Sequence, residues 1–215
     1  MKPAAILTTA LLASLSMPAM ANKSQSSIAA GFVFTEVGSG GFEDYFGDLY
    51  NNEDLSKSMF GAYVNGQYSF DNPLFISASM EGVTRSSTSL ESMDVQLGVA
   101  LPLAANIEGY LTGGVDWVRP IRRTSNVDGE GNFGYHKPYD HGAVAEAGVH
   151  IDVNSVWSVN PAYSYSDVFD NGIHKAKIHN TFNIRGGFGI QASYEYVFSK
   201  NLGQSNFKGG VIYAF

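Results

Sequence analysis

The sequence predicts an all-β chain that folds as a transmembrane, antiparallel, up-and-down β-barrel of about ten strands. Apolar and polar residues alternate with a period of two over about ten long segments. The connections between these segments alternate between short and long, which is typical of barrels with turns on one side and loops on the other. Only 15% of the residues are charged, against about 25% in an ordinary soluble domain.

The composition excludes several classes of protein. The chain has 215 residues, with 13 Lys and Arg, 20 Asp and Glu, and no Cys. The lack of Cys excludes disulfide scaffolds, Cys-ligated zinc, iron–sulfur clusters and thiol nucleophiles. A formal net charge of -7 argues against nucleic acid as a partner. A mean hydropathy of -0.07 is compatible with a barrel, because each strand averages a lipid-facing and a polar half.

The first residues predict an export signal. Lys2 gives a positive start, an apolar stretch follows over residues 4–15, and Ala19 and Ala21 form a small-x-small cleavage site. The stretch is too short for a permanent spanning helix. We therefore expect residues 1–21 to be a cleaved signal peptide, and a single barrel domain over residues 22–215 that begins at Asn22.

The segment over residues 107–118 illustrates the alternation. One face carries Ile107, Gly109, Leu111, Gly113, Val115 and Trp117, and the other carries Glu108, Tyr110, Thr112, Gly114 and Asp116. The segments have about the 9–11 residues that a tilted strand needs to cross a bilayer. In chain order they are 27–36, 57–70, 74–84, 90–101, 107–118, 141–152, 156–167, 177–187, 189–199 and 206–215.

Two places leave the strand count open. Pro161 lacks a backbone N–H and predicts a bulge or a late start of its strand. The turn in the run 185–189 is inferred from its glycines alone. Eight strands is therefore the alternative count, and a soluble β-sandwich is the alternative fold.

Against the sandwich, aromatic residues cluster at both strand ends, as at two membrane interfaces. At one rim we expect Phe34, Phe60, Trp117, Tyr165 and Phe198, and at the other Phe70, Trp157, Tyr213 and Phe215.

The last strand carries a resemblance to a known family. Gly209, Val211, Tyr213 and Phe215 alternate with other residues up to the final Phe. This pattern and the hairpin before it resemble the end of small OmpA-like outer-membrane β-barrel proteins of Gram-negative bacteria. The resemblance covers roughly the last thirty residues. It implies location in the cell outer membrane and insertion by the barrel-assembly machinery. The peptidoglycan-binding domain of the OmpA pattern is absent from this sequence, so a barrel alone is expected.

Charged residues on the inward faces predict a network in the lumen. By parity it contains Glu81, Asp94, Glu108, Asp116, Glu146, His150, Arg185, Glu195 and Lys208. One interpretation is a cation-leaning pore or a proton-linked gate. The other is a salt-bridge and water network that fills a narrow barrel, because eight to ten strands leave little space inside.

Two long connections are candidate contact surfaces. The first, residues 36–56, is acidic and aromatic and includes Asp44, Tyr45 and Asp48. The second, residues 119–140, is basic and includes Arg122 and Arg123. The basic connection is a candidate for binding the phosphates of lipopolysaccharide, and pairing between the two connections is the alternative.

No catalytic or metal-binding spacing emerges. The Asp-x-His pair of omptin-type proteases is missing, because Asp140 and His141 are adjacent and point to opposite faces. No His is followed two positions later by Ser, and no His cluster has ligand spacing.

We therefore expect a structural or interaction protein, with roles such as adhesion, surface contact or envelope integrity, that is not an enzyme and has no cofactor. The alternative is a narrow cation-leaning solute channel. An outer-membrane protease or lipid A-modifying enzyme is third. Outer-membrane lipid and lipopolysaccharide are the expected surroundings, and a monomer the expected state.

Overall fold

The computed structural model describes residues 26–38, 58–85, 88–124, 134–136, 139–169, 171–200 and 202–215. The strands are β1 (Ser27–Val37), β2 (Ser58–Ser69), β3 (Leu74–Arg85), β4 (Thr88–Ala104), β5 (Ile107–Thr124), β6 (Gly134–His136), β7 (Asp140–Asp152), β8 (Trp157–Ser166), β9 (Ile173–Arg185), β10 (Phe188–Phe198) and β11 (Gly203–Ala214). Within these ranges, no helix is long and apolar enough to cross a membrane.

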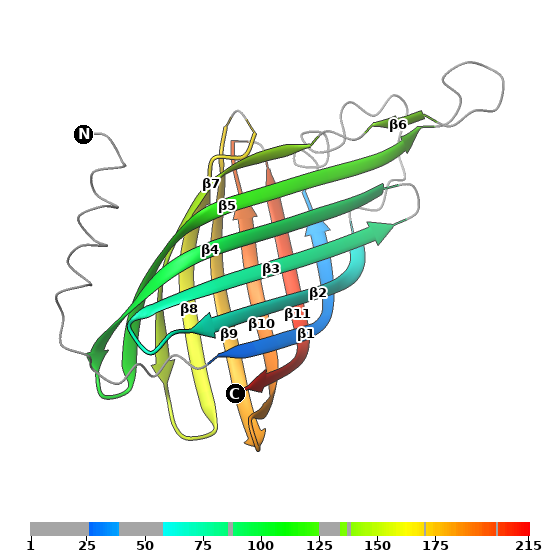
Figure 1. Cartoon of the computed structure of the whole chain (residues 1–215). Coiled ribbons are helices and arrows are strands. Elements are labelled where there is room, and N and C mark those ends of the chain that lie inside the picture. Colours follow the sequence, from blue (N-terminus) through cyan, green and yellow to red (C-terminus); the bar gives the residue numbers. More distant parts are fainter. Residues whose placement is uncertain are drawn as a thin grey trace, which may run out of the picture.

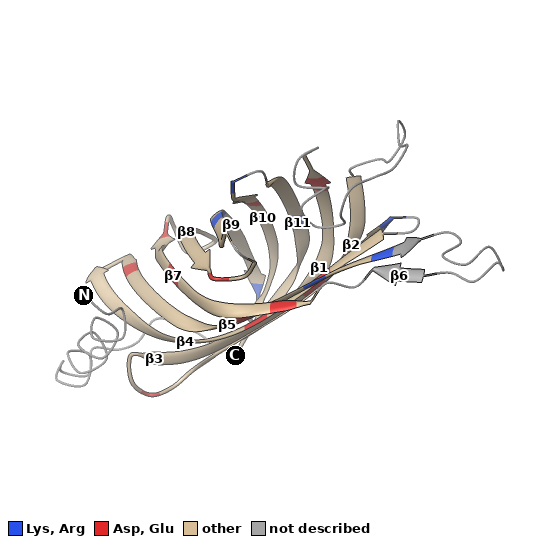
Figure 2. Cartoon of the chain, turned by 90° about the horizontal axis from the view of Figure 1, so that it is seen from above, with Lys and Arg blue, Asp and Glu red and all other residues tan. Residues whose placement is uncertain are grey.

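Ten of the described strands form a closed ring. Neighbours in the chain pair antiparallel, β5 pairs with β7, and β1 pairs with β11 from Ser27↔Ala214 to Val37↔Gln204. The short β6 pairs only with the last residues of β5. The strands are strongly tilted and wrap around one lumen (Figures 1 and 2). The closed ring confirms the predicted antiparallel barrel, and the eight-strand count and the β-sandwich were wrong.

The two ends of the barrel differ. The "turn end" carries the tight connections β2–β3, β4–β5, β7–β8 and β9–β10, together with the start of β1 and the end of β11. The "loop end" carries the other connections. In Figure 1 the turn end lies below and the loop end above. The turn inferred from glycines exists, with φ of 62° at Gly186 and 83° at Gly187, the left-handed conformation that suits a two-residue hairpin.

Pro161 behaves differently from the prediction. β8 runs from Trp157 to Ser166 with neither a bulge nor a late start. Its pairing with β7 is interrupted between Gly148↔Ala162 and Ile151↔Val159, and the register is the same on both sides. The missing N–H of Pro161 therefore removes local pairing without shifting the strand.

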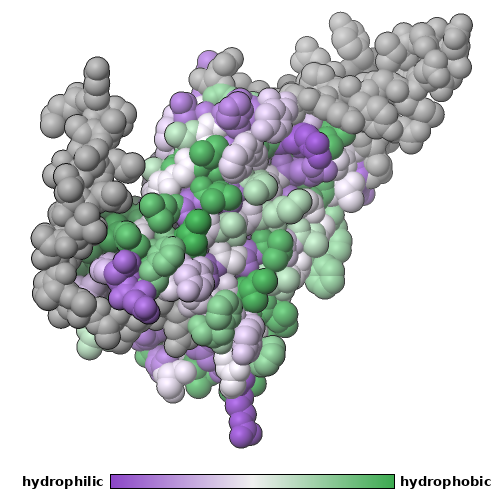
Figure 3. Space-filling model, viewed as in Figure 1, coloured by the Kyte–Doolittle hydropathy of each residue, from purple (hydrophilic) through white to green (hydrophobic). Residues whose placement is uncertain are grey.

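The outer wall is apolar. Phe32, Val211 and Ile184 are 64%, 63% and 68% exposed, and hydrophobic side chains cover much of the wall in view in Figure 3. Charged positions on the strands are sparse (Figure 2). Such an extent of exposed apolar surface is unusual for a monomer in water.

The inside of the barrel has two zones. Buried apolar side chains fill the lumen near the loop end, where we call them the loop-end cluster: Val33, Val37, Met59, Tyr63, Val83, Leu90, Val118, Val168, Ile173, Val197 and Leu202. Two of these residues, Val168 and Leu202, come from connections at the loop end and are buried. The lumen toward the turn end is polar, and a few buried polar side chains, such as Thr35, Gln204 and Asn206, lie at the level of the cluster.

Candidate functional site: a polar cavity in the lumen

A cavity of about 520 Å³ occupies the polar part of the lumen, and residues from all ten strands of the ring line it. The strands place polar side chains there because their inward positions alternate with apolar outward ones. On β9, for example, Lys175, Lys177 and His179 point inward, whereas Ala176 and Ile178 point outward and are exposed.

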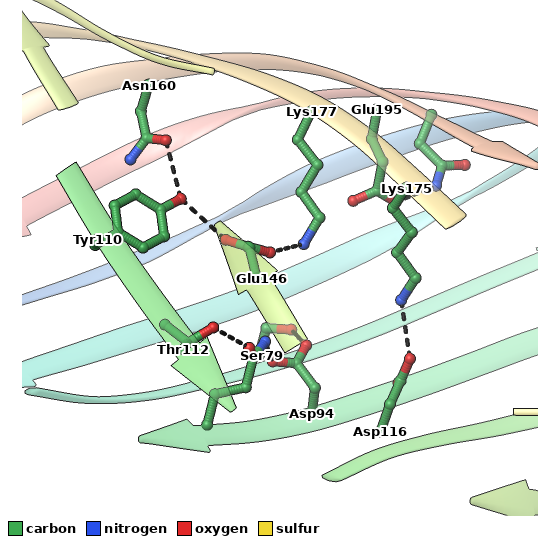
Figure 4. A network of polar contacts seen from close by, with 12 residues as sticks. Ser79, Asp94, Tyr110, Thr112, Asp116, Glu146, Asn160, Lys175, Lys177 and Glu195 are labelled. Carbon is green, nitrogen blue, oxygen red and sulfur yellow. Dashed lines mark hydrogen bonds and ion pairs between the residues drawn. The ribbon is translucent and has the colours of Figure 1, made fainter. Parts of the chain in front are cut away.

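Three lysines form ion pairs across the lumen. Lys177 Nζ lies 2.6 Å from Glu146 Oε2, and Lys175 Nζ lies 3.1 Å from Asp116 Oδ2. Figure 4 shows both lysines reaching from β9 toward β7 and β5. The third cation, on β11, is Lys208, whose Nζ lies 2.5 Å from Glu81 Oε2 and 3.8 Å from Glu195 Oε2. Except for Lys208–Glu195, which joins the neighbouring strands β11 and β10, these pairs link strands that are not neighbours in the ring.

Neutral hydrogen bonds extend the network. The Tyr110 hydroxyl donates to Glu146 Oε1 at 2.9 Å and lies 3.1 Å from Asn160 Oδ1. Asp94 accepts from the Ser79 hydroxyl and, at 2.7 Å, from Gln96 Nε2. These groups come from five strands, β3, β4, β5, β7 and β8, and Figure 4 shows the labelled ones converging on the lumen. Because these charged side chains have hydrogen-bond or ion-pair partners, they can be buried in the lumen.

A second chain of bonds runs between β1, β10 and β11. Thr35 Oγ1 donates to Asn206 Oδ1 at 2.8 Å, and Asn206 Nδ2 donates to Glu195 Oε1 at 2.8 Å. Gln204 Nε2 also donates to Asn206 Oδ1, at 2.8 Å. The network therefore connects the first strand to the last two, at the position where the ring closes.

Most of the predicted lumen residues come together in this zone. Seven of them line the cavity: Glu81, Asp94, Glu108, Glu146, His150, Glu195 and Lys208. Asp116 points inward and is bonded to Lys175 without lining the cavity. His150 Nε2 lies 3.1 Å from Asp152 Oδ1 near the turn end. Arg185 is a correction: it is the exposed last residue of β9, before the Gly186–Gly187 turn, and does not line the cavity.

Sequence reasoning missed Lys175 and Lys177, which supply two of the three lumen lysines. The predicted strand began at residue 177, but β9 begins at Ile173. Lys175 therefore lies in a predicted connection, and Lys177 is the first residue of the predicted strand. The signal was present: polar residues at 175, 177, 179, 181 and 183 alternate with apolar ones at 176, 178, 182 and 184.

The predicted contact residues divide into two groups. Asp44, Tyr45 and Asp48, with Ala19, Ala21 and Asn22, lie outside the described residues. Arg122 and Arg123 are a correction, since they belong to a strand. β5 continues through them to Thr124, and they pair with His136 and Tyr135 of β6.

The residues of the final-strand pattern form one outward row. Gly209, Val211 and Tyr213 alternate with inward residues on β11, which pairs with both β1 and β10. Phe215 follows the strand and is 66% exposed. The row therefore lies on the strand that closes the ring.

The fold is shared with known barrel proteins. The β domain of the Bordetella autotransporter BrkA matches with a TM-score of 0.52 and 12% identity, over 89% of this chain and 100% of that one. Ail, the attachment invasion locus protein of Yersinia pestis, matches with a TM-score of 0.44 and 15% identity, over 91% and 100%. The outer membrane protein OprG from Pseudomonas aeruginosa gives 0.43 and 15%, over 91% and 98%.

No family model matches the chain, and no curated protein matches it in sequence. The structural neighbours Ail, NspA, OprG and KdgM are outer-membrane β-barrel proteins. At these identities the likeness concerns the fold alone. The resemblance of the last strands to the OmpA-like family stays a prediction.

Proposed function

We propose that this chain is an integral outer-membrane β-barrel that acts as a structural or interaction protein through its loop end, and that its lumen does not conduct. The observation that carries the proposal is the loop-end cluster. An apolar constriction inside a pore excludes water and therefore ions. The ion pairs of Lys175, Lys177 and Lys208 also cross the lumen below it.

The membrane location is supported by the wall. A closed ring leaves no unpaired strand edge, which a bilayer requires of a β-structure. Outward-facing charges on the described strands lie toward the loop end: Glu36 on β1, and Glu91 and Arg119, which form an ion pair between β4 and β5. Export by the predicted signal and insertion through the final strand belong to the same proposal.

Heat-modifiable migration on a denaturing gel tests the barrel. We expect the unboiled protein to migrate differently from the boiled protein and to fractionate with outer membranes. A chain that migrates identically in both states and stays in the soluble fraction would refute the membrane proposal.

Conductance in planar bilayers tests the closed lumen. We expect no stable channel from the refolded protein at any applied voltage, with a general porin as the positive control. A reproducible cation-selective step would instead favour the channel, for which the surplus of carboxylates over lysines in the cavity is the supporting observation.

The interaction role is assigned to the loop end. Residues 39–57 are rich in acidic and aromatic side chains, Asp44, Tyr45 and Asp48 among them, and Arg119 and Arg122 lie near the loop end of β5. We propose that the basic side chains contact lipopolysaccharide phosphates.

Replacing residues 39–57 by a Gly-Ser linker should abolish adhesion of expressing cells to a basic surface while heat-modifiable migration persists. Unchanged adhesion would refute the role of this segment.

The proposal includes no catalytic step. In the described part of the chain, His150 and His174 bond to Asp152 and to the Tyr163 hydroxyl, and neither bonds to a serine. Mass spectrometry of lipid A and of a peptide library after incubation with the refolded protein tests this. A new cleavage product would identify an enzyme.

A further inference from the structure

The cavity reaches the turn end of the barrel. Ser27, Asp152 and Ala214 line it, and they stand at the turn-end limits of β1, β7 and β11. The side chains of His150 and Asp152 are 39% and 42% exposed there. At the opposite end the side chains of the loop-end cluster occupy the lumen. The cavity is therefore a blind pocket, which faces the periplasm if the proposed function is right.

The cavity wall carries more negative than positive charge. The acidic side chains that line it are Glu81, Asp94, Glu108, Glu146, Asp152 and Glu195, and the basic ones are Lys175, Lys177 and Lys208. With neutral histidines, six carboxylates against three lysines leave three negative charges. Glu108 and Glu195 are buried, so water screens their charges weakly and the pocket attracts cations.

No lysine of the described ranges forms an ion pair with Asp94, although Lys175 and Lys177 lie near enough to interact with its charge. Lys177 is bonded to Glu146, and Lys208 to Glu81. Asp94 instead accepts hydrogen bonds from two uncharged side chains, Ser79 and Gln96. Its negative charge therefore contributes directly to the surplus in the cavity.

A second observation points to a ligand with hydrogen-bond donors. Gln191 lines the cavity and is only 9% exposed, yet its Oε1 has no hydrogen-bond partner within the described part of the chain. A buried carbonyl oxygen without a partner is unfavourable. A ligand N–H at this place would satisfy it.

Aromatic rings complete the wall. Phe75 and Tyr110 both line the cavity and pack edge to face, with ring centroids 6.1 Å apart. Aromatic faces attract ammonium groups, most strongly where water is excluded. Carboxylates, an amide oxygen and aromatic rings together favour an organic ammonium ion. A metal ion fits less well, because no three His, Asp or Glu of the described ranges are grouped closely enough to hold one.

We propose that this pocket binds a small organic polycation, a diamine or polyamine, from the turn end. A molecule with two to four ammonium groups would neutralise the three surplus charges, and the volume of about 520 Å³ lies in the usual range of small-molecule sites. This site goes beyond the proposed surface role and relies on it only for naming the periplasm as the source.

Calorimetric titration of the refolded full-length protein in detergent micelles, with spermidine as the probe, tests the site. We expect saturable binding at one site, and no comparable binding of a neutral diol of similar length or of Mg²⁺. Asp94→Asn should weaken spermidine binding about tenfold or more. The matched control is Glu91→Gln, which removes an acid from the same strand but on its outward face, where Glu91 pairs with Arg119.

Several outcomes would overturn the proposal. Equal weakening by both substitutions would indicate general surface attraction, and equal binding of Mg²⁺ would indicate charge screening alone. Absence of spermidine binding to a heat-modifiable, folded barrel would overturn this inference and leave the proposed function standing. Failure to form a barrel at all would overturn both.

A measurement on the unmodified protein covers the case in which Asp94→Asn does not fold. In nuclear magnetic resonance spectra, spermidine should shift the side-chain amide signals of Gln191, in the cavity. The amide signals of Asn154, in the β7–β8 turn outside the cavity, should stay in place. An unshifted Gln191 signal at saturating spermidine would refute the site.

Discussion

Tyr110 can extend into the lumen because a neighbouring inward position lacks a side chain. A Cβ at Gly148 on β7 would overlap the Tyr110 hydroxyl and ring, and one at Gly98 on β4 would overlap the Phe75 ring. Both glycines are therefore required by close approach. The two rings that they accommodate form the aromatic wall of the cavity, so the shape of the cavity depends on the absence of side chains at these two glycines.

Gly148→Ala tests this packing. The added methyl group displaces Tyr110 and weakens its bond to Glu146, which should lower the free energy of unfolding by about 1–3 kcal/mol. Urea unfolding in lipid vesicles measures the change. Gly82→Ala is the matched control, because a Cβ there meets nothing within 4 Å. Equal effects of the two substitutions would contradict the packing argument.

The buried and the surface ion pairs should differ strongly in energy. Lys177→Met leaves Glu146 buried without its cation and should cost about 3–5 kcal/mol of unfolding free energy. Arg119→Met breaks the exposed pair with Glu91 and should cost about 1 kcal/mol or less. Adding Glu146→Gln to Lys177→Met should recover part of the loss. A double-mutant cycle from urea unfolding measures these energies, and no recovery would contradict the direct coupling of the two side chains.

At the scale of elements, the sequence predicted strand identity well and strand limits less well. Alternation located all ten strands of the ring because one face of each is apolar along its middle. Alternation did not predict the end of a strand where backbone pairing with a neighbouring strand extends beyond the apolar pattern. β5 passes Pro120 because β4 extends beside it to Thr88, which pairs with Arg122, and it reaches Thr124 because β6 pairs with its last residues. The apolar pattern ends before the hydrogen-bonded ladder does.

The final residue gives a prediction at this scale. The Phe215 ring is mostly exposed and stacks on the Tyr213 ring, so Phe215→Ala should leave refolding in detergent nearly unchanged. In cells, it should reduce the heat-modifiable fraction in outer membranes several-fold if the assembly machinery recognises this residue. Phe70→Ala, an exposed aromatic at the same end that packs on Tyr68, is the control. Equal loss with both variants would indicate a general interface effect.

At the scale of the whole molecule, the candidate site depended on information that alternation does not contain. Parity predicts which side chains face the lumen. It does not predict that Lys208 on β11 meets Glu81 on β3, with β1 and β2 between them in the ring. Such partners are set by the closure and stagger of the barrel. Parity also does not predict the division of the lumen into an apolar and a polar zone.

The loop-end cluster gives the last prediction. Leu90→Ser places a polar group in the cluster and should admit water, so that brief conductance steps appear in planar bilayers where the original protein gives none. Leu97→Ser on the outward face of the same strand should not produce them. Silence of Leu90→Ser in a correctly folded barrel would show that the lysine ion pairs block the lumen without the cluster.

The blind shape of the cavity also has an electrical consequence. A pocket filled with electrolyte from one side shares the potential of that side, so a voltage across the membrane falls almost entirely over the loop-end cluster. A cation in the pocket would move through little of that field, and work per charge depends on the fraction of the field crossed. The affinity of the pocket for a cation should therefore be nearly independent of voltage. This behaviour distinguishes a binding pocket that is open to one side from a conducting pore.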